Sequence, residues 1–78
     1  MNNARRKILK DAAEKLRNII SDVEYVRDEE QSAFDNLPEN FQMSDRGVQM
    51  EENISALEEV VDILTDALSE YESAVEDI

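Results

Sequence analysis

The 78-residue chain contains no cysteine, no histidine and no tryptophan, and it has one proline and one glycine. Without cysteine and histidine, the chain can form no disulfide, no thiolate or imidazole metal site and no histidine-activated nucleophile. A single glycine also rules out a glycine-rich phosphate-binding loop. We therefore expect a protein without enzymatic activity, cofactor or metal.

Long apolar runs are absent as well. No stretch approaches the roughly 18 apolar residues that span a bilayer, and the N-terminus lacks the apolar core of a signal peptide. We expect a cytoplasmic location and no membrane contact. A chain this short buries little surface on its own. Because disulfides and metals are excluded, self-association is the support that we expect.

Positive charge is scarce beyond the start of the chain. The sequence has 20 acidic and 8 basic residues, a net charge of -12. The first 20 residues hold six of the basic residues and only two acidic ones, which leaves a net charge of -16 for the remainder. Nucleic-acid phosphates would be repelled by most of this molecule, so we expect no direct nucleic-acid binding.

The apolar residues follow a spacing of three and four, which is typical of a helix with one apolar seam. In a first helix, predicted over about 4–35, a break at Glu30 interrupts the predicted seam. That seam consists of Leu9, Ala12, Leu16, Ile19, Val23, Val26, Ala33 and Leu37. In a second helix, predicted over about 45–77, the seam is unbroken and consists of Met50, Ile54, Leu57, Val61, Leu64, Leu68, Tyr71, Val75 and Ile78.

The turn between these helices is predicted over about 36–44. Pro38 suits the first turn of a short helical piece capped by Asn36, and Ser44 suits the N-cap of the second helix. Gly47 lies in the seam, where a missing side chain allows another element to come close. So short a connection requires antiparallel helices. The predicted fold is therefore all-α, a two-helix hairpin forming a single domain over 1–78.

Further apolar residues lie beside the two seams and have no partner within one hairpin. We predict an oligomer interface that contains Ile20, Phe34, Val60, Ile63 and Ala67. Two hairpins that bury these residues would form a homodimeric four-helix bundle. A different partner and a monomer remain as alternatives.

Beyond residue 50 the second helix carries no positive charge. We predict a partner-binding acidic face made of Glu58, Glu59, Asp62, Asp66 and Glu70. Carboxylates four residues apart are spaced about 6 Å along a helix, and like charges at this spacing slightly destabilise it. Such a row resembles the phosphates of a nucleic-acid strand. The alternative is that these charges only keep a small bundle in solution.

The turn and the first half of the second helix, F34-D-N-L-P-E-N-F-Q-M-S-D-R-G-V-Q-M-E-E-N-I-S-A-L-E-E59, resemble a group of small uncharacterised proteins of bacteria, phages and mobile elements. Those proteins are similar in having a turn of the form N-L-P-E-x-[L/F]-Q-x-S-[D/E]-R-G before an acidic amphipathic helix. The resemblance suggests a recognition tip made of Phe41, Gln42, Asp45 and Arg46. Alternatively, Leu37, Phe41 and Met43 close the end of the bundle.

These patterns support two hypotheses about function. In the first, the protein is a phage or mobile-element inhibitor that mimics nucleic acid and binds a host protein that processes nucleic acid. In the second, it is a structural or assembly component that works through the apolar surfaces of a helical bundle.

Overall fold

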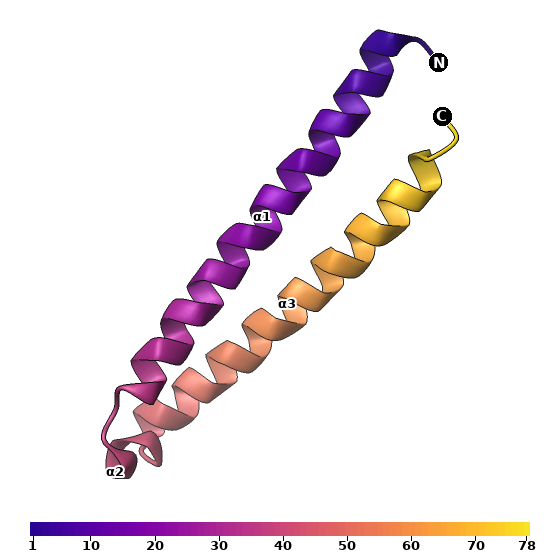
Figure 1. Cartoon of the computed structure of the whole chain (residues 1–78). Helices are drawn as coiled ribbons and strands as arrows, with labels where there is room; N and C mark the ends of the chain where they lie inside the picture. Colours follow the sequence, from indigo (N-terminus) through magenta and orange to yellow (C-terminus); the bar gives the residue numbers. More distant parts are fainter.

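The protein is entirely helical, as predicted. The computed structural model describes residues 1–78 and contains a long helix α1 (Asn3–Asp35), a short helix α2 (Glu39–Gln42) and a second long helix α3 (Asp45–Val75). In Figure 1, α1 and α3 run in opposite directions, with α2 at one end and both termini at the other. The result is a narrow rod of 60 × 15 × 12 Å.

The helix ends follow from local capping. Asn2 begins α1, since its side-chain oxygen accepts the N–H of Arg5 at 2.8 Å. Ser44 begins α3 in the same way by accepting the N–H of Gly47 at 3.4 Å, which confirms the predicted N-cap. The predicted end of this helix at about 77 lies slightly beyond the observed end at Val75. Acidic residues follow at 76 and 77, and negative charge is unfavourable at the negative end of a helix dipole.

The prediction for the short helical piece was wrong in its details. Pro38 lies just before α2 and not in its first turn, and no side chain caps this helix. Asn36 is instead the C-cap of α1, and its backbone N–H donates to the Ser32 carbonyl oxygen at 3.0 Å. The first helix continues through Asp35, so Asn36 serves its end and is not free to begin the next helix.

Gly47 allows the close approach that its position predicts. It is buried in the first turn of α3, against the end of α2. A Cβ placed on it would lie 2.1 Å from the Gln42 carbonyl oxygen and 2.7 Å from that of Phe41. No side chain fits there without a movement of the backbone, so the absence of a side chain lets the chain turn tightly into α3.

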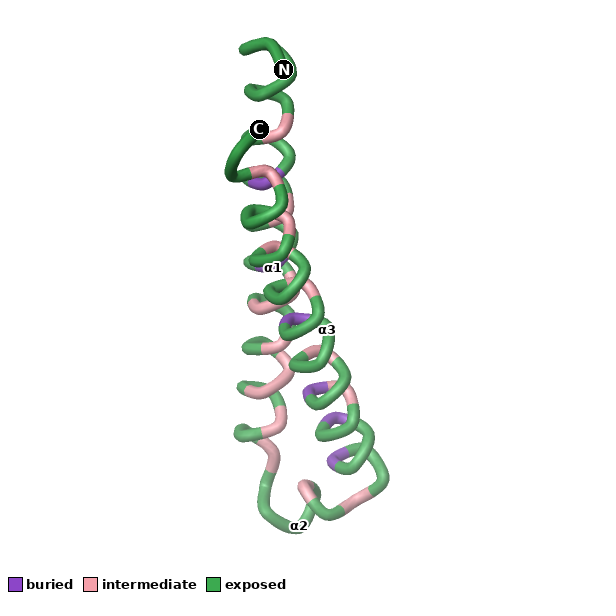
Figure 2. The backbone as a smooth tube through the Cα atoms, turned by 90° about the vertical axis from the view of Figure 1, so that its right-hand side faces the viewer, coloured by how far each residue is buried: buried purple, intermediate pink, exposed green.

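The seam of α3 is confirmed by burial. Met50, Ile54 and Val61 are buried against α1, and Gly47 is buried against the end of α2. Half-buried residues continue the same line toward the end of the helix: Leu57, Leu64, Leu68, Tyr71 and Val75. Ile78 lies beyond the helix and is exposed. Figure 2 shows that burial is confined to a thin line between the two long helices.

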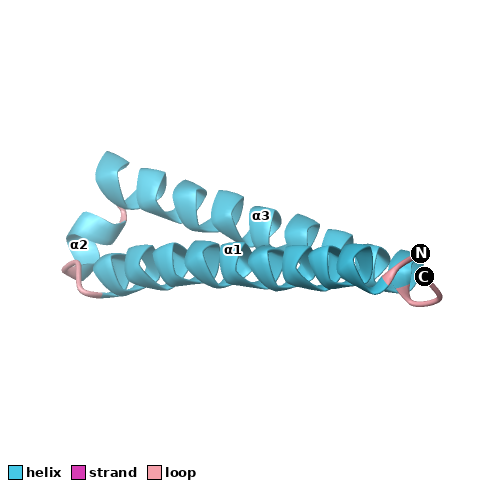
Figure 3. Ribbon diagram, turned by 90° about the horizontal axis from the view of Figure 1, so that it is seen from above, coloured by secondary structure: helices cyan, strands magenta, loops and turns pink.

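The buried line of α1 is shifted from the predicted seam by one residue at every second position of that seam. Ala13 and Ile20 face α3, whereas the predicted Ala12, Ile19 and Val26 are exposed. The apolar surface of α1 is wider than one seam, so apolarity alone does not select a line. The observed line brings the basic flank of α1 toward the acidic end of α3. Figure 3 shows that the two long helices cross at an angle.

This difference corrects one residue of the predicted oligomer interface. Ile20 is only 8% exposed and packs within the helix pair, so it is not available as an outer surface. Phe34 is half-buried at the α2 end of the rod and keeps part of its surface exposed. The other three predicted interface residues, Val60, Ile63 and Ala67, are exposed on α3.

Candidate functional site

The acidic face predicted on the second helix lies fully on the outside of α3. All five of its carboxylates, those of Glu58, Glu59, Asp62, Asp66 and Glu70, are exposed, and none of them forms an ion pair. The one α3 carboxylate with a basic partner is Glu72. No part of α1 therefore neutralises the acidic face, and its charge is directed at the solvent.

The row of carboxylates follows a spiral. Four residues in an α-helix turn through about 400°, so each step advances about 6 Å and rotates about 40° around α3. From Glu58 to Glu70 the row winds about 120° around the outside of the helix. The row is therefore a right-handed band around α3 and not a straight line. A partner that contacts all its carboxylates must curve around α3.

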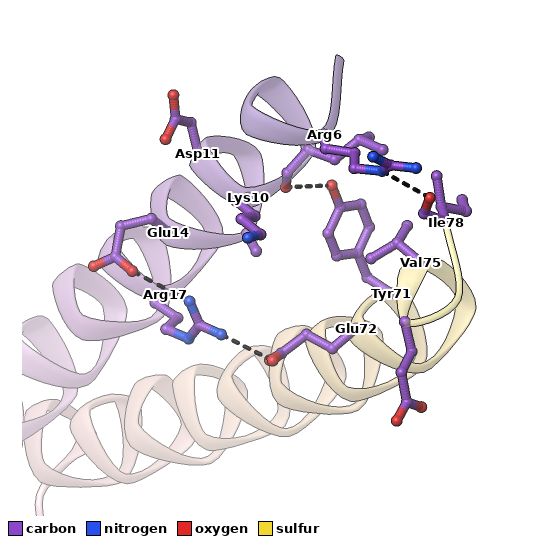
Figure 4. A pocket seen from close by; sticks show the side chains of 12 residues that line it. Arg6, Lys10, Asp11, Glu14, Arg17, Tyr71, Glu72, Val75 and Ile78 are labelled. Carbon is purple, nitrogen blue, oxygen red and sulfur yellow. Dashed lines mark hydrogen bonds and ion pairs between the residues drawn. The ribbon is translucent and has the colours of Figure 1, made fainter. Parts of the chain in front are cut away.

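A second candidate is a cleft of about 740 Å³ between α1 and α3 near the termini. Figure 4 shows Tyr71 at its centre. The Tyr71 hydroxyl donates to the Leu9 carbonyl oxygen at 2.7 Å. The Arg6 Nε donates to the Ile78 carbonyl oxygen at 2.9 Å, a contact that joins the two ends of the chain.

The charges around this cleft nearly cancel. Arg17 lies between two carboxylates, with its guanidinium 2.9 Å from Glu72 and 3.2 Å from Glu14. The cleft is lined by three cations, Arg6, Lys10 and Arg17, and by four carboxylates. Such a lining leaves an excess of a single negative charge, spread over exposed side chains, and concentrates neither sign for a ligand. The arrangement holds the open end of the rod together and brings the basic start of the chain beside its acidic end.

Of the four residues of the predicted recognition tip, three are exposed and one is half-buried. Gln42 is half-buried, and its side-chain amide donates to the carbonyl oxygens of Leu37 at 3.1 Å and Phe34 at 3.3 Å. It therefore holds the turn against the end of α1. Phe41, Asp45 and Arg46 are exposed. Leu37 is half-buried, whereas Phe41 and Met43 stay in solvent and do not close the end of the helix pair.

A third surface is formed by the apolar residues that flank the two seams. On both helices these residues lie one position before a residue of the observed seam. We refer to this surface as the apolar face and define it as Ala12, Ile19, Val26 and Ala33 of α1 with Val60, Ile63, Ala67 and Ala74 of α3. All eight are exposed.

Two contacts are missing from the sequence prediction. Nothing in the pattern indicated that Gln42 would hold the turn, because a glutamine in a loop is usually solvated. The Tyr71–Leu9 hydrogen bond was also missed, although a tyrosine in an apolar seam is a signal, since a buried hydroxyl needs a partner.

The chain matches no protein-family model, no curated protein and no solved structure. The likeness of its turn to the small hairpin proteins therefore stays a prediction. No group of three acidic side chains lies close enough together to hold a metal ion. No helix is both long enough and apolar enough to cross a membrane.

Proposed function

We propose that this chain is a non-enzymatic interaction protein whose acidic face binds a basic partner, as a mimic of a nucleic-acid strand. The hypothesis extends to a phage or mobile-element inhibitor that binds a host protein which processes nucleic acid. One observation carries the proposal: all five carboxylates of the acidic face are exposed and unpaired.

The position of these carboxylates supports a binding role. Three of the eight basic residues form ion pairs, and none of these pairs involves the acidic face: Lys7 pairs with Asp11, Arg17 with Glu14 and Glu72, and Arg27 with its neighbours Glu24 and Asp28. Unpaired like charges at successive helical turns slightly destabilise α3. A right-handed band of negative charge on a rigid helix fits the basic groove of a nucleic-acid-binding protein. Long-range attraction would also speed the encounter.

The test is affinity capture with the tagged protein from nuclease-treated bacterial lysate, followed by elution with rising salt. We expect a nucleic-acid-binding protein at intermediate salt, because a contact dominated by exposed charges weakens steeply with ionic strength. The captured protein is then mixed with duplex DNA. The acidic chain should compete with the DNA for the same binding site on that protein.

A triple variant, Glu58→Gln, Asp62→Asn and Asp66→Asn, removes three charges from the acidic face. A control variant, Asp28→Asn, Glu29→Gln and Asp35→Asn, removes the same number from exposed positions of α1. We expect the first variant to lose capture and the second to keep most of it. Equal capture by both would show that net charge, and not the acidic face, governs binding. Glu70 stays unchanged because it borders the apolar face.

A second role is favoured by a separate observation. The apolar face exposes large side chains such as Ile63 (58% exposed) and Val26 (52% exposed) along the middle of the rod. Exposed apolar side chains clustered on one surface mark an interaction site more often than scattered ones do. In this role the helical hairpin is an assembly component, and two copies would form a four-helix bundle. A partner held by this face would resist salt.

A further inference from the structure

The apolar residues of α1 and those of α3 lie on the same broad side of the rod. The charged flank of each helix, on the other side of its seam, shows this most directly. Arg17 and Glu72 flank their seams on the sides opposite to Ile19 and Ala67, and their charged groups meet at 2.9 Å. Since these two flanks share one side of the helix pair, the flanks on the opposite side of each seam must share the other. The apolar face is therefore one continuous strip along the rod.

The strip is broad because two helices contribute to it. Ile19 and Val26 occupy the middle of α1, and Val60 and Ile63 occupy the facing part of α3. Alanines lie toward the ends, at positions 12, 33, 67 and 74. The large apolar groups at the centre offer a second pair of helices the most area to bury, and the alanines at the ends add little bulk.

The isolated rod leaves an unusually large surface exposed. A compact protein of this mass exposes about 4,900 Å² by the usual scaling of surface with mass, whereas this chain exposes 5957 Å². The excess, about 1,100 Å², is larger than the about 800 Å² that one partner contributes to a standard interface. Only 6 of the 78 residues are buried and no side chain is completely buried. The lone rod thus exposes more surface than a compact fold of its mass, by an amount comparable to one side of a standard interface.

The charges along its edges are complementary to those of a second copy. Lys15 borders the apolar face on α1 and Glu70 borders it on α3, and neither forms an ion pair within the chain. Tyr71 contacts Leu9 and Asn53 contacts Glu30, so Lys15 and Glu70 lie at nearly the same level along the rod. A two-fold axis parallel to the helices would bring Lys15 of each copy to Glu70 of the other.

The opposite arrangement, with the turns at opposite ends, is electrostatically worse. It places α3 against α3, and this helix carries nine carboxylates and a single arginine. The parallel arrangement places α3 against α1 of the other copy, where the basic start of α1 meets the acidic end of α3. The same pairing of ends already holds the single chain together.

We propose that the apolar face binds a second copy of this chain, in a two-fold four-helix bundle with both turns at the same end. The dimer buries Ile19, Val26, Val60 and Ile63 at its centre and pairs Lys15 with Glu70 on both edges. The inference does not depend on the basic partner of the acidic face. It identifies the partner in the proposed assembly role as a second copy of the chain, and it specifies how the two copies are arranged.

The first test is mass in solution over a concentration series, by sedimentation equilibrium. The wild-type chain should approach twice its 9.0 kDa. Val26→Glu and Ile63→Glu should each raise the dissociation constant about a hundredfold or more, because the symmetry places each new carboxylate in the interface twice. Tyr25→Glu is the matched control: Tyr25 is exposed and next to Val26, but it points away from the apolar face. It should dimerise like the wild type.

Charge exchange tests the arrangement without depending on a buried substitution. Lys15→Glu and Glu70→Lys should each weaken the dimer about tenfold, and the double exchange should restore it. Glu70→Lys is the sharper of the two, because it reduces the net charge from -12 to -10. If general repulsion governed association, this variant would dimerise more tightly. That result, or a double exchange that fails to restore binding, would overturn the proposed pairing.

The relative direction of the two copies can also be tested by measuring the distance between their turns. The chain has no cysteine, so Asn40→Cys at the exposed turn gives one spin-label site per copy. Turns at the same end should give a short distance between labels, well under the length of the rod. A distance near its 60 Å length would overturn the parallel arrangement. A wild-type chain that stays at 9.0 kDa at every concentration would overturn the second copy itself, while leaving the acidic face to its own test.

Discussion

Replacing Gly47 by alanine should destabilise the protein, although alanine is the better helix former. In an ordinary helix position the change would stabilise by about 1 kcal/mol. At Gly47 the new Cβ would lie 2.1 Å from the Gln42 carbonyl oxygen and 2.7 Å from that of Phe41. Both are backbone atoms, which cannot rotate away as a flexible side chain would, so α2 must shift relative to α3. Overpacking of this kind typically costs about 1–3 kcal/mol.

With the gain in helix propensity subtracted, we expect a net loss of up to about 2 kcal/mol for Gly47→Ala, and for a domain of this size about 1 kcal/mol corresponds to about 4–8 °C in melting temperature. Thermal unfolding followed by helical circular dichroism at one fixed protein concentration measures it, since association would make the midpoint depend on concentration. Ser55→Ala is the control, because Ser55 is exposed in the middle of α3 and should gain a few tenths of a kcal/mol. If Gly47→Ala melts above the wild type, as Ser55→Ala should, the close approach does not limit this position.

Three further substitutions test the contacts that hold the rod together. Tyr71→Phe removes a hydrogen bond from the open end and should cost about 1 kcal/mol, whereas Tyr25→Phe, at an exposed tyrosine without a partner, should change the urea midpoint little. Ser44→Ala removes the N-cap of α3 and should cost about 1 kcal/mol in the same titration. Gln42→Ala removes two hydrogen bonds and should cost about 1–2 kcal/mol. Unchanged midpoints for these three variants would show that the contacts contribute nothing to folding.

The second helix was predictable because its seam is unbroken and lies on one line. Met50, Ile54 and Val61 are buried as their spacing indicates, and Ser44 caps the helix as predicted. The close approach at Gly47 was also predictable, since a glycine at a seam position leaves room for a second backbone where a side chain would otherwise pack.

The first helix was less predictable because it carries two adjacent apolar lines. The line with Ile19 and the line with Ile20 fit the same spacing of three and four, and the choice depends on contacts far away in the sequence. Arg17 reaches Glu72 only when Ile20 faces inward. An amphipathic pattern identifies a helix well, but it cannot select between two seams when both are apolar.

The acidic face and the apolar face also differ in how far the sequence predicts them. Exposure of the acidic face follows directly from the sequence, because a helix with so many carboxylates can bury none of them without partners. The apolar face needed the structure, since only the relative rotation of α1 and α3 places Val26 and Ile63 on one side of the rod.

The proportions of the rod have a consequence for how the molecule tumbles. A particle of 60 × 15 × 12 Å rotates quickly about its long axis and slowly end over end. The backbone N–H bonds of α1 and α3 lie nearly along that axis, so their nuclear relaxation reports the slow rotation almost alone. Frictional drag in gel filtration is raised for the same reason. Both methods will assign a single copy the apparent size of a larger globular protein, so its state of association must be read from mass.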